Sequence, residues 1–172
     1  MPYRRTWLRA AVYAVVLMLF ALSCQASGPQ GIAELPKGTP AMALTPHLSY
    51  LHDKSAVDTP EDAWRKIAAG GFQRVPKGKT AFGFQQGAYW FHAEVVNRDP
   101  DELHWMLVQR FALLDRIDLF VRYPDGRVVQ QASGDSLPFS ARSISYRDPN
   151  FRIEPPIDQK VEILVRAQSQ SS

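Results

Sequence analysis

The sequence predicts an all-β domain of the β-sandwich or jelly-roll type, and two observations support this. The first is a hairpin: apolar and polar residues mostly alternate over residues 113–121, a turn follows at 123–126, and a second β-prone run covers 127–132. The second is that short runs of this kind recur between turn signals, with one helical segment near the N-terminus. This spacing is typical of a sandwich rather than of alternating strands and helices.

The turn of the hairpin has the residues that a tight reversal requires. Pro124 presets φ, Asp125 can accept a hydrogen bond from its own backbone, and Gly126 tolerates positive φ. We expect this hairpin to be the central strand pair of the domain.

The helical segment has a clear start and a clear end. Thr59 is a suitable N-cap, Pro60 suits the first helical position, and two acids follow where the helix dipole favours them. The helix is expected over residues 63–69 and ends at Gly70. Trp64 and its apolar neighbours on the same face should dock on the domain.

The other predicted strands are short and lie between turns. They cover residues 47–53, 72–75, 81–84, 88–96, 103–110, 151–154 and 161–167, with a long loop over 133–150. The strand 88–96 has Tyr89 and Phe91 on one face and Trp90 on the other. If Tyr89 and Phe91 face the core, Trp90 lies on the outer or concave face.

The N-terminus resembles an export signal. Arg4, Arg5 and Arg9 precede an apolar run at residues 10–22, which is short for a membrane span. Residues 24–26 fit a cleavage site, so residues 1–26 are predicted to be a signal peptide. Two alternatives are lipidation of Cys24 and an uncleaved anchor.

Cleavage after Ala26 has chemical consequences. Cys24 is the only cysteine, so the remaining chain would have no disulfide, cysteine zinc site or cysteine nucleophile. The net charge of +3 matches the three arginines of the signal, which leaves a neutral domain without a basic stripe for nucleic acid. Residues 27–46 are predicted to be a flexible lead-in and 47–172 the sandwich domain. The final strand ends close to Ser172, as though the domain were truncated.

Short pieces spread over about 120 positions resemble one family, the 7TMR-DISM extracellular domain, type 2. Their order and spacing carry the resemblance. They are Tyr50-Leu51-His52-Asp53, Ala88-Tyr89-Trp90-Phe91, Asn97, Trp105, Leu113-Leu114-Asp115, Ile117, Leu119, Phe120, Gly134-Asp135, Pro138-Phe139-Ser140, Arg142, Arg147 and Val165-Arg166-Ala167-Gln168-Ser169.

The resemblance implies a periplasmic sensor module with a jelly-roll sandwich similar to carbohydrate-binding modules. It also implies seven membrane helices downstream and then a cytoplasmic diguanylate cyclase or histidine kinase, in a parent protein of the inner membrane. A homodimer is possible. No catalytic motif of such an output domain occurs in these 172 residues.

Two groups of residues are candidates for ligand binding. Trp90, His92 and Glu94 share one face of a strand, where an indole could stack on a sugar while polar groups bind its hydroxyls. The alternative is that Trp90 packs under a loop or under the helix of Trp64.

The second group is Arg142 and Arg147, which could hold a carboxylate ligand. The alternative is that Asp135 or Asp148 pairs with them and fixes the loop. Asp115 is interpreted as a partly buried structural anchor.

The sequence gives little support for catalysis. The four histidines lack metal-ligand spacing, no nucleophile elbow occurs, and no catalytic residue, metal or cofactor is predicted. We therefore expect a ligand-sensing domain of a membrane receptor that binds a small carbohydrate or carboxylate. The alternative is a free-standing exported carbohydrate-binding module.

Overall fold

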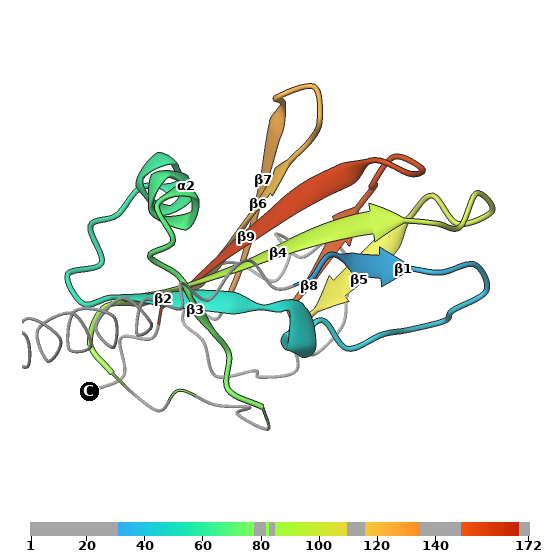
Figure 1. Ribbon diagram of the computed structural model, residues 1–172. Coiled ribbons are helices and arrows are strands. Elements are labelled where there is room, and N and C mark those ends of the chain that lie inside the picture. Colours follow the sequence, from blue (N-terminus) through green and yellow to red (C-terminus); the bar gives the residue numbers. More distant parts are fainter. Residues whose placement is uncertain (1–30, 78–81, 83–84, 110–115, 135–148, 169–172) are drawn as a thin grey trace, which may run out of the picture.

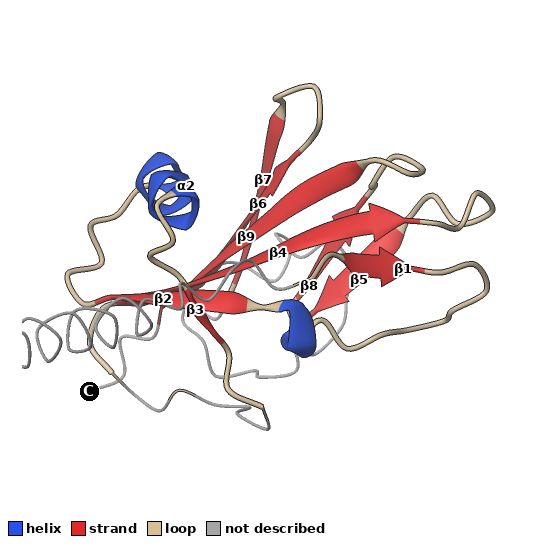
Figure 2. Cartoon of the chain, viewed as in Figure 1, coloured by secondary structure: helices blue, strands red, loops and turns tan. Residues whose placement is uncertain are grey.

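The computed structural model describes residues 31–77, 82, 85–109, 116–134 and 149–168, and there it confirms the all-β prediction. Two β-sheets, one α-helix and one 3-10 turn make up this part of the chain (Figures 1 and 2). The larger sheet has the strand order β3-β2-β4-β9-β6-β7, with β1 also paired to β4, and the smaller sheet is β5-β8. The bounds are β1 Ala33–Leu35, 3-10 turn Thr45–His47, β2 Ser49–Asp53, α2 Pro60–Ala68, β3 Gln73–Arg74, β4 Ala88–Asn97, β5 Trp105–Val108, β6 Arg116–Arg122, β7 Val128–Ser133, β8 Asn150–Ile153 and β9 Lys160–Gln168.

The long strands β4 and β9 form the middle of the larger sheet. They are antiparallel and pair from Ala88 opposite Gln168 to Val96 opposite Lys160. The β6-β7 hairpin lies beyond β9 and ends the row, so the expectation of a central strand pair was wrong. Alternation predicts strands and their faces, but it carries no information about the order of the strands in the sheet. Here β9, the last strand in the chain, lies between β4 and β6.

The turn of the hairpin forms as predicted. The amide of Gly126 donates to the carbonyl of Tyr123, and Gly126 has a φ of 85°. The carboxylate of Asp125 accepts from the amide of Arg127 at 2.9 Å. These contacts match the roles that the residue types predict for a tight turn.

Residues 27–46 were expected to be a flexible lead-in, but part of this segment forms regular structure. Its residues Ala33–Leu35 form β1, which pairs in parallel with the end of β4. Ala33 and Leu35 are buried, and Glu34 between them is exposed. Three residues are too few to show a periodic signal among glycines and prolines, and β4 supplies the pairing that makes this strand.

The larger core lies between the two sheets. Its central residues come from β1, β4, β6, β8 and β9, and Trp105 and Leu107 of β5 pack against them. The fully or largely buried members are Ala33, Leu35, Val95, Ile117, Leu119, Val121, Tyr123, Phe151, Ile153, Val161 and Ile163. The antiparallel strands and this shared core make the described residues a β-sandwich.

A second, smaller core lies on the opposite face of the larger sheet, under α2. Trp64 of the helix packs with Trp90 of β4, Phe120 of β6 and Leu164 of β9. Figure 1 shows α2 and the small sheet on different sides of the long strands. The predicted docking of the Trp64 face is therefore confirmed.

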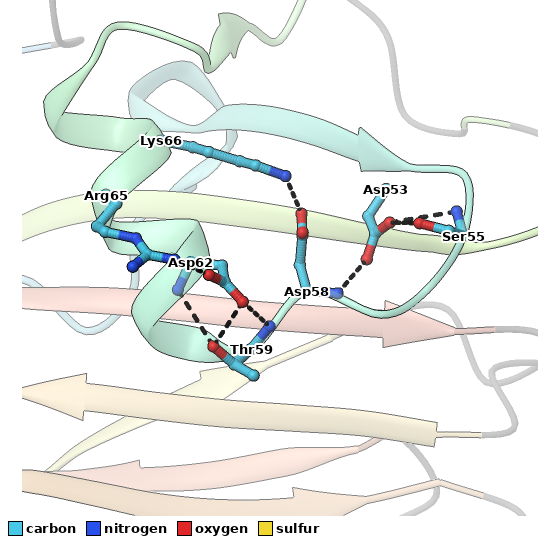
Figure 3. Close-up of polar contacts among 7 residues, drawn as sticks. All are labelled: Asp53, Ser55, Asp58, Thr59, Asp62, Arg65 and Lys66. Carbon is cyan, nitrogen blue, oxygen red and sulfur yellow. Dashed lines mark hydrogen bonds and ion pairs between the residues drawn. The ribbon is translucent and has the colours of Figure 1, made fainter.

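The connection between β2 and α2 is fixed by side-chain hydrogen bonds (Figure 3). Thr59 and Asp62 form a reciprocal capping box, and Asp62 also pairs with Arg65. Asp58 pairs with Lys66 of the helix. The start of the helix is thus specified locally, as the sequence predicts.

Asp53 organises the turn that leads to this helix. Its carboxylate accepts hydrogen bonds from the amide and hydroxyl of Ser55 and from the amide of Asp58. Burial by itself raises the pKa of Asp53, but these hydrogen bonds outweigh it and the net pKa is lowered. The turn is therefore stabilised by an ionised carboxylate.

Some expectations fall on residues outside the described ranges. The predicted strand 81–84 lies outside these ranges except for Phe82, as do Asp115 and residues 135–148 of the predicted loop 133–150. The two ends of that loop are strand residues, because β7 ends at Ser133 and β8 begins at Asn150. The predicted strand 103–110 is shorter, with β5 covering Trp105–Val108. No helix among the described residues is long and apolar enough to cross a membrane.

Candidate functional site

Trp90 lies beneath α2 rather than on an open face of the sheet. Its side chain is 0% exposed and belongs to the core that contains Trp64. This is the packing alternative that the sequence analysis left open. In this structure the indole presents no free ring face on which a sugar could stack.

His92 and Glu94 lie on the same covered face and contact charged residues there. His92 is 5% exposed, and its Nε2 lies 3.7 Å from a carboxylate oxygen of Glu162. Glu94 forms an ion pair with Lys160 at 2.7 Å. Both polar side chains of the predicted group therefore face other residues of the sheet.

Glu162 is the centre of this charged group. The pKa of Glu162 is lowered, first by His92 and then by Arg122, against the opposing effect of burial. The 3.7 Å separation from His92 is an ion-pair distance rather than a hydrogen bond, whereas Arg122 donates to Glu162 at 2.5 Å. Arg122 also stacks over the ring of Trp64, 4.6 Å from its centroid. These contacts hold α2 on the sheet.

The other predicted ligand residues, Arg142 and Arg147, lie outside the described residues, together with Asp135 and Asp148. The structure therefore brings together three of the five predicted site residues, on the face that α2 covers. Within the described ranges, no group of histidine, cysteine, aspartate and glutamate side chains could hold a metal ion.

The opposite face of the same strands carries a set of partly exposed rings, which we call the aromatic surface. It consists of Tyr50 and His52 from β2, Tyr89 and Phe91 from β4, and Phe82 from the loop before β4. The register of the sheet makes this surface, because Tyr50 pairs with Phe91 and His52 with Tyr89. Residues that are opposite in paired strands point to the same side of the sheet.

The rings of the aromatic surface contact one another closely. Phe82 lies within 4.6–5.3 Å of the ring centroids of Tyr50, Tyr89 and Phe91. His52 stacks on Tyr89 with centroids 4.4 Å apart and an interplanar angle of 7°. Burial is the main cause that raises the pKa of Tyr89, so its hydroxyl stays neutral at physiological pH. The rings thus pack on one another, and Tyr89 contributes a neutral hydroxyl to the surface.

The charges of the sheet are found on the other face. Glu94, Glu162 and Arg122 form one transverse row of paired residues there, and Arg166 and Asp118 belong to another. Beside the aromatic surface, β9 contributes Val165 and Ala167, which pair with Phe91 and Tyr89. Among the described residues, the two faces therefore separate charged groups from neutral rings.

His52 is held by the start of β4 as well as by Tyr89. Its Nε2 lies 2.9 Å from the carbonyl oxygen of Gln86. The next residue, Gly87, has a φ of 101°, and a Cβ there would lie 2.3 Å from the carbonyl oxygen of Asp53. Only glycine permits this close approach, which fixes the Gln86 carbonyl beside the imidazole.

The sequence contains the signal for the aromatic surface, although the analysis of the sequence did not assign it. Tyr50 and His52 are two residues apart, as are Tyr89 and Phe91, so each pair shares one face of a strand. In the sequence, Tyr89 and Phe91 were considered as core-facing only as a condition for an outward Trp90. The structure places both on the same face of β4 as Val95 of the larger core. The register between β2 and β4, which a single sequence does not give, is what joins the two pairs.

Comparison with known proteins identifies the family. The 7TMR-DISM extracellular 2 family matches residues 45–172, so the chain belongs to this family. Membership indicates an extracellular or periplasmic sensor module of receptors. The curated proteins contain no match to the chain.

Proposed function

We propose that this domain senses a small neutral carbohydrate in the periplasm, on behalf of a membrane receptor, and binds it at the aromatic surface. The observation that carries the proposal is the set of five partly exposed rings on a face of the sheet where the described residues include no charged side chain. Proteins commonly bind small ligands with aromatic side chains and a few polar groups.

The chemistry of the surface favours a sugar. The apolar C–H face of a pyranose can pack on a ring such as Tyr89, while its hydroxyls need neutral hydrogen-bonding partners. Such partners lie at the edge, where the Tyr50 hydroxyl donates to the side chain of Gln73 at 3.3 Å and His52 contacts Gln86. A carboxylate ligand would lack a cation on this part of the sheet and would need one from Arg142 or Arg147.

The strand pairing supports a sensing role. Tyr89 and Phe91 lie on β4, and each pairs directly with a residue of β9, the last strand of the sheet. A ligand that binds one packing arrangement of this sheet better than another shifts the population toward it. In the proposed receptor, membrane helices that follow β9 would transmit this change to a cyclase or kinase.

A free-standing exported carbohydrate-binding module is the second candidate, because it would use the same rings. The reading frame beyond Ser172 distinguishes the two candidates. The receptor requires apolar membrane helices and an output domain there, whereas a stop codon directly after Ser172 would favour the free-standing module.

The binding experiment uses the purified protein on an array of neutral and acidic glycans, with calorimetry for each glycan that binds. We expect binding to a neutral glycan, and about tenfold weaker affinity in Tyr89→Ala, since one ring contact contributes about 1 kcal/mol. Val128→Ala is the control, because Val128 is a 44% exposed apolar residue on β7, away from the surface.

Two results would overturn the proposal. One is binding of acidic glycans only, which would indicate a site with arginine residues in place of the aromatic surface. The other is a neutral glycan whose affinity is the same in Tyr89→Ala and in the unmodified protein.

A further inference from the structure

We propose that His52 determines which ligands the aromatic surface accepts, by presenting its Nδ1 as a fixed hydrogen-bond acceptor to a ligand hydroxyl. The inference rests on the proposed function for the identity of the ligand. The state of the imidazole itself follows from contacts within the protein.

The contact with Gln86 fixes the tautomer of His52. A backbone carbonyl oxygen can only accept a hydrogen bond, and the carbonyl of Gln86 lies 2.9 Å from Nε2. The proton of the neutral imidazole must therefore be on Nε2. Nδ1 then carries a lone pair and can only accept.

This acceptor is open to solvent. No residue within the described ranges forms a hydrogen bond with Nδ1, and Nδ1 is not among the buried polar atoms that lack a partner. The His52 side chain is partly exposed. A donor group of a ligand can therefore reach Nδ1 without displacing a protein contact.

The orientation of this acceptor is held from two sides. The ring stacks on Tyr89 at an interplanar angle of 7°, and Tyr89 belongs to the aromatic surface. The Gln86 carbonyl is fixed in turn by the close approach of Gly87 to the backbone of Asp53. A preorganised acceptor loses little conformational freedom when the ligand binds.

The consequence is a preference for ligands that can donate a hydrogen bond to Nδ1 of His52. A sugar hydroxyl placed beside Nδ1 can donate its proton to the lone pair while its ring carbons pack on Tyr89. The corresponding O-methyl ether has no proton to donate, so Nδ1 would lose its partner on binding. We therefore expect the surface to discriminate between a hydroxyl and a methoxy group at one position of the sugar.

The first test measures the tautomer in the ligand-free protein. Nitrogen-15 NMR of the histidine side chains, with His52 assigned by its loss in His52→Gln, distinguishes a protonated from an unprotonated ring nitrogen. In the neutral form of the ring we expect a protonated Nε2 and an unprotonated Nδ1. A proton on Nδ1 would overturn the inference whether or not a glycan binds.

The second test uses a neutral glycan found on the array and a matched pair of variants. In His52→Gln the amide group can replace the Nε2 donor but leaves nothing at the Nδ1 position, whereas in His52→Asn the amide oxygen can replace Nδ1. Both lose the stacked ring equally. We expect His52→Gln to bind about tenfold more weakly than His52→Asn, and both to unfold cooperatively.

The outcomes separate this inference from the proposed function. Failure of the unmodified protein to bind any neutral glycan overturns the proposed function, and the hydroxyl preference with it. Binding that is equal in the two variants, or equal for the hydroxyl and O-methyl forms of every position, overturns only the role of His52.

Discussion

The two faces of β4 differ in what covers them, although both carry aromatic residues. Trp90 and His92 lie under α2, in contact with Trp64, Phe72 or the charged residues of neighbouring strands. Tyr89 and Phe91, one residue away along the chain, lie among partly exposed rings. The same strand thus supplies the core under α2 on one side. On the other side it supplies the candidate ligand surface and, further along at Val95, part of the larger core.

Aromatic side chains in a strand therefore have to be assigned by what packs on each face. An indole beside a histidine and an acid has the composition of a sugar site, yet a helix of nine residues covers it here. The other face carries the aromatic surface, whose two phenylalanines, two tyrosines and one histidine are partly exposed, as such a site requires. Three predictions test how the two faces differ.

The largest expected effect is on the covered face. Trp90→Ala removes a fully buried ring and should lower the free energy of unfolding by about 3 to 5 kcal/mol, measured by chemical denaturation. Tyr89→Ala, on the partly exposed face, should cost about 1 kcal/mol. Equal costs for the two substitutions would show that both faces are equally part of the core.

An intermediate effect is expected at Gly87, directly before β4. Gly87→Ala places a Cβ 2.3 Å from the carbonyl oxygen of Asp53 at a φ of 101°, and should cost about 2 to 3 kcal/mol. It should also change the NMR signals of His52, because the Gln86 carbonyl moves. Gly126→Ala is the control, since Gly126 also has positive φ but no atom lies within 4 Å of its Cβ position. Unchanged His52 signals in a destabilised Gly87→Ala protein would contradict this coupling.

The smallest expected effect is the pH dependence of Asp53. Its pKa in the folded state is below its ordinary value of 3.8, so the ionised carboxylate contributes stability above that value. This contribution is lost as pH falls through the folded pKa. Asp53→Asn should therefore be less stable by about 1 to 2 kcal/mol at neutral pH, and the difference should shrink in acid.

Thermal unfolding between pH 7 and pH 2.5 measures the effect. Asp125→Asn is the control, because Asp125 also accepts a backbone hydrogen bond but lies in an exposed turn. A stability difference for Asp53→Asn that does not change with pH would show that the hydrogen bonds of the carboxylate do not depend on its ionisation.

Local features of this protein were determined by its sequence alone. The N-cap at Thr59, the turn at residues 123–126 and the alternation within β4 depend on neighbouring residues, so a single sequence reveals them. The order of short pieces between Tyr50 and Ser169 likewise indicated the sensor family, and the family match over residues 45–172 confirms it. These features involve contacts between positions close in the chain, or patterns that a family preserves.

Only the tertiary structure decided which faces and edges are covered. Strand β9 lies between β4 and β6, so the hairpin is at the end of the row. Helix α2 covers Trp90, so the packing alternative for this residue holds. The pairing of β2 with β4 joined Tyr50 and His52 to Tyr89 and Phe91. Each outcome depends on contacts between residues far apart in the chain, and periodicity within one strand cannot specify such contacts because it does not name the partner strand.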